Sequence, residues 1–209
     1  MPVPDHLIGR KVRLREVGAR DRRALTNLDR DAARSGSPQV GDYRHWGAHR
    51  SGTADPAHFA IETLRAERLV GSIYATGVDP VAGRFSYGIG IASQHQRCGY
   101  ASDAITTLLR HMFWHRGFRT CEVSIYSGNM ASLSLHGVLG FREERRLPDT
   151  EMVRGKVRYL VLMGITAEEF AGRHPRAPVV RADRGRHWRA RRGQHWGALA
   201  GRTSGKPPS

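Results

Sequence analysis

The sequence predicts an α/β (α+β) fold, in which a mixed sheet carries helices on both of its faces. Strand-like and helix-like segments alternate through the middle of the chain but not at its start, which indicates a mixed sheet rather than a purely parallel one. With 209 residues, 39% of them apolar, the chain is long enough for one domain with a sizeable core. A short glycine-containing turn between a strand and a helix, residues 96–101, is the feature that points most directly to function.

The first half of the chain predicts four strands and one helix. The strands cover residues 7–16, 59–63, 68–76 and 85–92, and the helix begins at Asp21. In the first strand, Val12 and Leu14 alternate with charged side chains, which is the period of a strand with one buried face. In the fourth strand, bulky residues alternate with small ones, so one of its faces is nearly bare. Because Gly88 and Gly90 lie on this bare face, we expect a ligand to approach the backbone closely there.

Residues 34–57 predict a long loop, because glycine, serine, proline and histidine dominate them. The loop contains Tyr43 and Trp46. A loop of this length that carries aromatic residues is typical of a segment that covers a substrate, and surface packing is the alternative.

The second half of the chain predicts two helices and two strands. The helices cover residues 101–116 and 129–138, and the strands cover residues 120–126 and 157–163. The first of these helices has an apolar face at helical spacing, and Gly117 follows it as a C-cap. Gly140 ends the second helix. Together these elements place the folded domain in residues 1–170.

Residues 171–209 form a segment of a different kind. They hold ten of the 34 lysines and arginines but only one of the 19 acidic residues, so they carry +9 of the net charge of +15. A basic segment with few aliphatic residues cannot build a core, and we expect a disordered tail. Weak, non-specific RNA binding through charge and aromatic stacking is the alternative to a passive extension.

The composition indicates a cytoplasmic protein with no membrane partner. No apolar run approaches the ~18 residues that cross a bilayer. The N-terminus lacks the charged-then-apolar pattern of a signal peptide. The two cysteines, Cys98 and Cys121, do not form a disulfide framework, which fits a reducing compartment.

The turn at residues 96–101 reads Gln-Arg-Cys-Gly-Tyr-Ala and opens a helix. The first turn of a helix has N–H groups without intrahelical acceptors and carries partial positive charge. A glycine-containing turn at that place can aim several N–H groups at one phosphate. The residues therefore predict a phosphate-binding turn, without naming the phosphate compound.

This turn resembles the acyl-CoA pyrophosphate loop of the GNAT superfamily of N-acetyltransferases, which reads Gln/Arg-x-x-Gly-x-Gly/Ala. Gln96, Gly99 and Ala101 fit this form. The similarity covers roughly residues 7–170 and looks nearest to the branch that contains ribosomal-protein N-terminal acetyltransferases. It implies a GNAT-like, mostly antiparallel central sheet with a splayed pair of strands that binds acyl-CoA.

A second block at the expected distance supports the resemblance. Asn129-x-x-Ser132, followed by Gly140-Phe141, is similar to the Asn-x-x-Ser/Ala helix of the family that ends in Gly-Phe. The two blocks occur in the family's order and on the expected elements.

The resemblance implies acetyl-CoA as co-substrate and assigns residues to it. The backbone of the turn would hold the pyrophosphate, the preceding strand would pair with the pantetheine arm, and the second block would bond the arm or its neighbouring phosphate. The implied cofactor-binding residues are Ile89, Gly90, Ile91, Gln96, Arg97, Cys98, Gly99, Tyr100, Ala101, Asn129 and Ser132. Helix capping is the competing role for Asn129. Cys98 stands where the family often has glycine or lysine, and its backbone N–H remains available.

Three residues are candidates for the chemistry. A backbone N–H near Ile91 would face the thioester carbonyl. His136 lies seven residues after Asn129, where relatives often carry tyrosine, and would give a proton to the departing thiolate. Glu62 is the candidate general base, because Ser86 stands where many relatives have an acidic residue; a solvated strand carboxylate is the alternative for Glu62.

His111 and His115 have the spacing of metal ligands on one helix. No glutamate follows His111, and the two cysteines are not spaced to complete a site. We therefore expect no metal and interpret these two histidines as part of a solvated helix face.

The resulting hypothesis is an acetyl-CoA-dependent N-acetyltransferase. It would move an acetyl group to a primary amine, either a protein N-terminus or a small molecule, by direct attack in a ternary complex. A non-catalytic acyl-CoA- or RNA-binding module on the same fold is the alternative. The sequence leaves the acceptor and the oligomeric state open, with a homodimer as one alternative.

Overall fold

The computed structural model describes residues 3–34, 58–153 and 156–175, which all belong to one compact unit, Met1–Arg176. The strands are β1 (Val12–Glu16), β2 (His58–Thr63), β3 (Leu69–Asp79), β4 (Arg84–Ile91), β5 (Thr120–Tyr126), β6 (Arg142–Val153) and β7 (Lys156–Thr166). The helices are α1 (Ala19–Arg34), α2 (Tyr100–Arg110), α3 (Met130–Leu139) and α4 (Ala167–Arg173). The predicted loop, with Tyr43 and Trp46, lies outside the described residues from position 35 onward. Of the predicted tail only residues 171–175 are described, and its first three residues complete α4.

The seven strands form one sheet in the order β1-β2-β3-β4-β5-β7-β6. Every neighbouring pair is antiparallel except β4 and β5, which run parallel and are joined by the crossover that contains α2. The predicted mixed, mostly antiparallel sheet is therefore confirmed.

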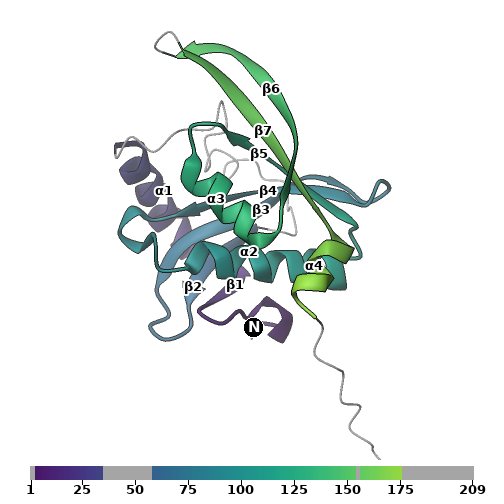
Figure 1. Ribbon diagram of the computed structural model, residues 1–209. Coiled ribbons are helices and arrows are strands. Elements are labelled where there is room, and N and C mark those ends of the chain that lie inside the picture. Colours follow the sequence, from purple (N-terminus) through teal and green to yellow (C-terminus); the bar gives the residue numbers. More distant parts are fainter. Residues whose placement is uncertain (1–2, 35–57, 154–155, 176–209) are drawn as a thin grey trace, which may run out of the picture. The chain divides into compact units, whose positions relative to one another are not determined.

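Helices cover both faces of this sheet, as predicted (Figure 1). α2 and α3 lie on one face, and the buried side chains of Val12 and Leu14 belong to the core on that face. Arg15 points to the other face, where its guanidinium donates to the carboxylate of Asp21 in α1. The alternation of β1 between apolar and charged residues thus sorts its side chains between the core and the α1 side.

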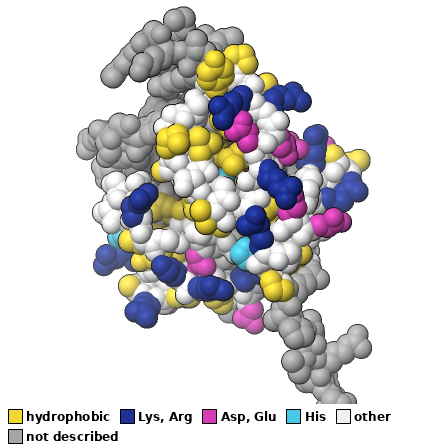
Figure 2. Space-filling model, in the orientation of Figure 1, with side chains coloured by type: hydrophobic (Ala, Val, Ile, Leu, Met, Phe, Trp, Pro, Cys, Tyr) yellow, Lys and Arg dark blue, Asp and Glu magenta, His cyan; other side chains and the backbone are white. Residues whose placement is uncertain are grey.

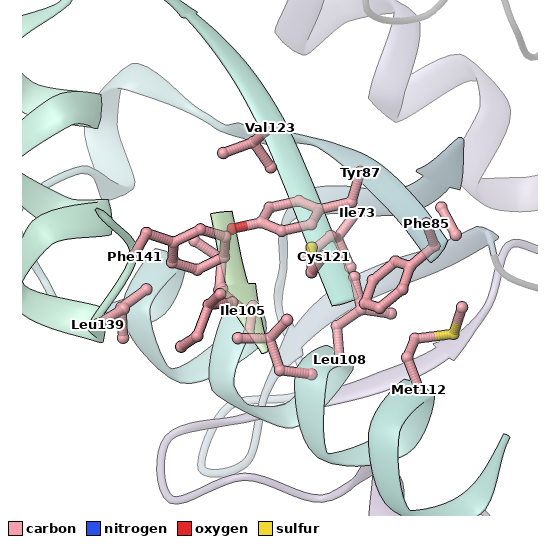
Figure 3. Packing of buried hydrophobic residues seen from close by; sticks show 14 of the residues in the cluster. Ile73, Phe85, Tyr87, Ile105, Leu108, Met112, Cys121, Val123, Leu139 and Phe141 are labelled. Carbon is pink, nitrogen blue, oxygen red and sulfur yellow. The ribbon is translucent and has the colours of Figure 1, made fainter. Parts of the chain in front are cut away.

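Buried apolar side chains of α2 and the central strands pack together in the core (Figure 3). Phe85 of β4 and Cys121 of β5 face Ile105 and Leu108 of α2 and Met112 of the turn that continues this helix. All five side chains are at most 1% exposed. This packing holds β4 and the first turn of α2 in a fixed relation, and the connection between them contains the predicted phosphate-binding turn.

Two elements were not predicted from the sequence. β6 contains seven charged residues, a proline and no period-two alternation, and it forms the edge of the sheet beside β7. α4 begins with a complete capping box, in which Thr166 and Glu169 bond each other's backbone, and it buries Phe170. The Thr-x-x-Glu pattern was visible in the sequence and is the signal that could have identified α4.

The helix predicted over residues 101–116 consists of α2 and a π-helical turn, His111–His115. The interpretation of His111 as part of a solvated face is wrong, because this side chain is buried. Its ring stacks on His6 with a centroid distance of 5.1 Å and meets Phe59 edge-on. His115 is exposed and also stacks on His6, at 4.1 Å. The N-terminal segment therefore buries His111, which the helical pattern alone assigns to the solvent-exposed face.

The surface on the α2 and α3 side combines apolar and basic side chains (Figure 2). Met130 and Val138 of α3 are more than half exposed. Lys and Arg side chains are scattered over this face of the molecule. None of the described helices is both long enough and apolar enough to cross a membrane.

Candidate active site

The sheet opens between its two parallel strands. β4 and β5 pair only through Arg84 with Thr120 and Phe85 with Cys121. Beyond this point β4 stays paired with β3 up to Ile91, and β5 stays paired with β7 up to Tyr126. The inner edges of β4 and β5 therefore separate after two residue pairs, and the splayed strand pair implied by the resemblance is present.

The free edge of β4 presents backbone groups to this opening. The N–H of Ala92 donates to the carbonyl of Val70 at 2.9 Å, so this pair is a hydrogen-bonded pair of the antiparallel ladder. Hydrogen-bonded pairs alternate along such a ladder, so the backbone groups of Ile91 and Ile89 point away from β3. These are the two residues expected to pair with an extended ligand, whereas Gly90 between them bonds toward β3.

The bare face of β4 has a different cause from the one expected. A Cβ atom added to Gly88 would lie 2.4 Å from the phenol ring carbon and oxygen of Tyr74 on β3. Gly88 is therefore required by the packing of Tyr74, and the expectation that a ligand approaches the backbone at this glycine is wrong. At Gly71 of β3 it is backbone that approaches closely, because an added Cβ there would lie 2.0 Å from the carbonyl oxygen of Gly90.

The turn after β4 has the backbone geometry of an anion-binding loop. Arg97 and Gly99 both have positive φ, +63° and +79°, and Gly99 caps α2 without a side-chain hydrogen bond. Within the described part of the chain, no acceptor receives the N–H groups of residues 97–102. Consecutive unpaired N–H groups at the N-terminus of an 11-residue helix form a cradle for a phosphate group.

A clamp from the N-terminal segment holds this cradle. The carboxylate of Asp103, in the first turn of α2, accepts the N–H groups of Arg10, Lys11 and Val12 at 2.7 to 3.0 Å. The ammonium of Lys11 donates to the carbonyl of Cys98 at 2.8 Å, so it lies beside the cradle. Sequence reasoning missed both side chains. Lys11 is 87 positions from Cys98, and no local pattern signals such a contact.

The second block forms α3 as predicted. The side chain of Asn129 accepts the N–H of Ser132 at 3.1 Å, so the capping role of Asn129 is present. Gly140, with φ of +102°, ends the helix in the left-handed conformation.

His136 is buried and both of its ring nitrogens have partners. Nδ1 lies 2.7 Å from the carbonyl oxygen of Ser132, and Nε2 lies 2.8 Å from the hydroxyl of Tyr87 on β4. Burial lowers the pKa of His136, although the bond to the Ser132 carbonyl acts in the opposite direction. Burial raises the pKa of Tyr87 well above its usual value, so both groups are neutral near pH 7. Tyr87 is a residue of this site that sequence reasoning assigned only to the alternation of β4.

Glu62 lies in an ion-pair network on the other face of the sheet. Its carboxylate contacts the guanidinium of Arg13 and accepts from Nε of Arg15 at 2.7 Å. The side chain is 8% exposed, so the alternative interpretation of a solvated carboxylate is wrong. Both carboxylate oxygens are engaged by arginines, and the structure does not bring Glu62 together with His136.

No group of histidine, cysteine or acidic side chains in the described ranges has the arrangement of a metal site. His6, His111 and His115 are close to one another, but they stack face to face rather than converging on one point. Cys98 is an exposed free thiol, and Cys121 is a buried one.

Solved structures of acetyltransferases share this fold. The spermidine N-acetyltransferase of Vibrio cholerae, in a crystal structure with CoA and spermine, superposes with a TM-score of 0.63 at 20% identity, covering 76% of this chain and 97% of that one. A GNAT acetyltransferase of Bacillus anthracis superposes with a TM-score of 0.63 at 17% identity, covering 78% and 98%. At these identities the similarity establishes the fold alone.

Two bacterial proteins are similar in sequence. One is an uncharacterized prophage-derived N-acetyltransferase, YokL of Bacillus subtilis, with 29% identity over 106 residues, 51% of this chain and 60% of that protein. The other is the uncharacterized N-acetyltransferase p20 of Bacillus licheniformis, with 25% identity over 114 residues, 54% of this chain and 64% of that protein. The chain thus matches about three fifths of the length of these relatives. Residues 11–142 match the family defined as the acetyltransferase (GNAT) domain, and since this is more than half of the chain, the protein belongs to the GNAT acetyltransferase family.

Proposed function

We propose that this protein is an acetyl-CoA-dependent N-acetyltransferase that acts on a primary amine by direct attack in a ternary complex. The observation that carries the proposal is the opening between β4 and β5. It joins a free strand edge at Ile89 and Ile91 to a cradle of unpaired N–H groups at residues 97–102. An extended arm that ends in a pyrophosphate has the shape and charge to use both features.

Acetyl-CoA fits the residues present and supplies the acetyl group as a thioester. The backbone of Arg97, Cys98, Gly99, Tyr100 and Ala101 would hold its phosphates, with Gln96 fixing the start of the turn. Ile89, Gly90 and Ile91 would border its arm, and a backbone N–H near Ile91 would polarise the thioester carbonyl. From α3, Asn129 and Ser132 would bond the arm from the opposite side of the opening.

For the acceptor, we propose a protein N-terminal amine, in line with the resemblance to the ribosomal-protein branch. Residues 1–170 carry a net charge of +6, and a polycationic acceptor would meet repulsion from this surface. A polyamine remains the competing acceptor, because the structural neighbour from Vibrio cholerae was crystallised with spermine.

Two measurements test the activity. Isothermal titration calorimetry with CoA measures binding, and thiol release from acetyl-CoA in the presence of single amines measures transfer. Mass spectrometry of the acceptor then identifies the acetylated nitrogen. We expect release with a peptide that has a free N-terminus and none with the same peptide blocked at its N-terminus. CoA binding without release from any primary amine would refute the enzyme and support a non-catalytic acyl-CoA-binding module.

We also propose that residues 1–170 form the catalytic domain and that the basic tail is not needed for acetyl-CoA binding. The truncation should end at residue 175 rather than 170, because Phe170 is buried and α4 continues to Arg173. We expect unchanged CoA affinity in the truncated protein. A loss of RNA binding with retained CoA binding would assign RNA affinity to the tail. A loss of CoA binding would refute the division.

A further inference from the structure

Tyr87 and His136 form a buried hydrogen-bonded pair where the sheet begins to open. Phe85 makes the last pairing of β4 with β5, and Tyr87 is the next residue of β4 on the same face. Figure 3 shows its hydroxyl directed away from β4, between Val123 of β5 and Phe141. The strand rises about 3.3 Å per residue, so Tyr87 lies two residues, or roughly 7 Å, deeper in the opening than Ile89.

The hydrogen bonds of this pair have a defined direction. Nδ1 of His136 lies 2.7 Å from the carbonyl oxygen of Ser132, and a carbonyl oxygen can only accept. Nδ1 therefore carries the proton of the neutral ring, and Nε2 has a lone pair. It follows that the hydroxyl of Tyr87 donates to Nε2 across 2.8 Å.

This hydrogen-bond direction argues against a direct transfer of a proton from His136 to the departing thiolate. Its one N–H is given to the main chain, and its lone pair is occupied by Tyr87. The oxygen of Tyr87 keeps lone pairs that can accept a proton from a group in the opening. The resting pair is thus set to take up a proton through Tyr87 before it gives one back.

We propose that Tyr87 and His136 form a proton shuttle between the attacking amine and the departing sulfur, a role that rests on the proposed acetyl transfer. The reaction of a neutral amine forms a C–N bond and breaks a C–S bond, so the amine nitrogen must lose one proton and the sulfur must gain one. An acceptor that is an ammonium ion in solution releases its additional proton to solvent before it enters the site. Tyr87 Oη takes the proton of the amine while its own hydroxyl proton moves to Nε2 of His136. The proton then returns from Nε2 to Tyr87, and the hydroxyl of Tyr87 protonates the sulfur. The pair ends as it began, and no external base or acid is consumed.

In this arrangement Tyr87 is the catalytic residue and His136 is a positioning residue that acts through it. The imidazolium that forms for a moment donates from Nδ1 to the Ser132 carbonyl, which stabilises the positive charge. Cys121 faces Tyr87 from β5, but burial raises the pKa of its thiol, so it stays neutral. The apolar side chains of α2, such as Ile105, exclude water from the pair. The shuttle requires neither an acidic residue at position 86 nor a free Glu62, whose carboxylate is engaged by arginines.

Three variants separate this role from a structural one: Tyr87→Phe, His136→Phe and the double variant. Each single change leaves one buried polar group without its partner and should lower stability, whereas the double change removes both and should recover part of it. We expect kcat to fall about 100-fold in each single variant and to stay equally low in the double variant, with unchanged CoA affinity. Tyr159→Phe, at an exposed position of β7, is the control and should keep full activity.

Two outcomes of the kinetics would overturn the shuttle. If kcat recovers together with stability in the double variant, the pair is structural. If the two single losses multiply in the double variant, the residues act independently.

A second readout does not depend on turnover. Two-bond ¹H–¹⁵N spectra of the wild-type protein should show the Nδ1-protonated ring of His136 between pH 6 and 8, and CoA should shift its Nε2 resonance. An Nε2-protonated ring, or no response to bound CoA, would refute the shuttle even if acetyl transfer is found. If CoA shifts the resonance but no amine is acetylated, the proposed function fails while the placement of the pair at the opening stands.

Discussion

The clamp between α2 and the N-terminal segment predicts a large loss of stability in Asp103→Ala. The two exposed bonds of the carboxylate, to the N–H groups of Arg10 and Lys11, would be replaced by water at a cost of about 0.5–1 kcal/mol each. The N–H of Val12 is part-buried, and leaving it without an acceptor costs about 1–3 kcal/mol. We therefore expect a loss of about 3 kcal/mol in the free energy of unfolding.

Thermal unfolding followed by circular dichroism at pH 7 measures this loss. For a domain of this size each kcal/mol corresponds to roughly 2–4 °C, so the expected decrease in Tm is about 9 °C. Asp5→Ala is the matched control, because Asp5 is an exposed aspartate of the same N-terminal segment. A loss below about 1 kcal/mol in Asp103→Ala, or an equal loss in the control, would show that the three bonds do not hold the segment.

Three further predictions concern the cradle, the buried histidine and the ion-pair network. Gly99→Ala adds a Cβ atom to a residue with φ of +79°, at 3.0 Å from Nζ of Lys11, so CoA affinity should fall about 10-fold. In the control Gly128→Ala the added Cβ meets nothing within 4 Å, and CoA affinity should be unchanged. Burial, aided by neighbouring cations, lowers the pKa of His111 to about 4, against about 6.5 in the unfolded chain. The neutral, buried ring of His111 therefore contributes its full stabilisation above pH 6.5, and this contribution is lost as the pH falls toward 4. Between pH 7 and pH 5, the wild-type protein should lose about 2 kcal/mol more of its free energy of unfolding than a His111→Gln variant, and an equal loss in the two proteins would contradict this. Glu62→Gln should lower stability by about 2 kcal/mol, because Arg13 and Arg15 each lose one of their two carboxylate partners. A 100-fold loss of kcat in a fully folded variant would instead support the general base.

The sequence predicted the elements in which one local rule is strong. β5, Thr120–Tyr126, and α3 were found within one residue, because strict alternation and a capped apolar helix leave few other solutions. The glycine turn was found because its physical requirement, unpaired N–H groups at a helix start, is written in consecutive residues. β6 was missed because it is an edge strand paired only with β7, so it needs no alternating apolar face.

The parts of the site that depend on distant contacts were not predictable. Glu62 was identified as a chemical candidate, but its pairing with Arg13 depends on the register of β1 against β2. Likewise, His136 was selected by its position in the second block, whereas its partner Tyr87 lies 49 residues earlier and meets it only through the packing of α3 against β4. Spacing along the chain identifies an element, and only the fold identifies which side chains share a hydrogen bond.

β4 and β5 are paired through two residues of each strand, and this short pairing affects how the scaffold can evolve. The distance between the strands beyond Phe85 and Cys121 is set by a few side chains packed beneath them, not by ladder hydrogen bonds. Substitutions among those side chains can therefore widen or narrow the space for the acyl group without disturbing the sheet on either side. In the proposed complex, the phosphate end of acetyl-CoA would be held by backbone N–H groups, which are common to nearly all residue types. Donor selectivity would then drift through core substitutions while recognition of the CoA nucleotide stays constant.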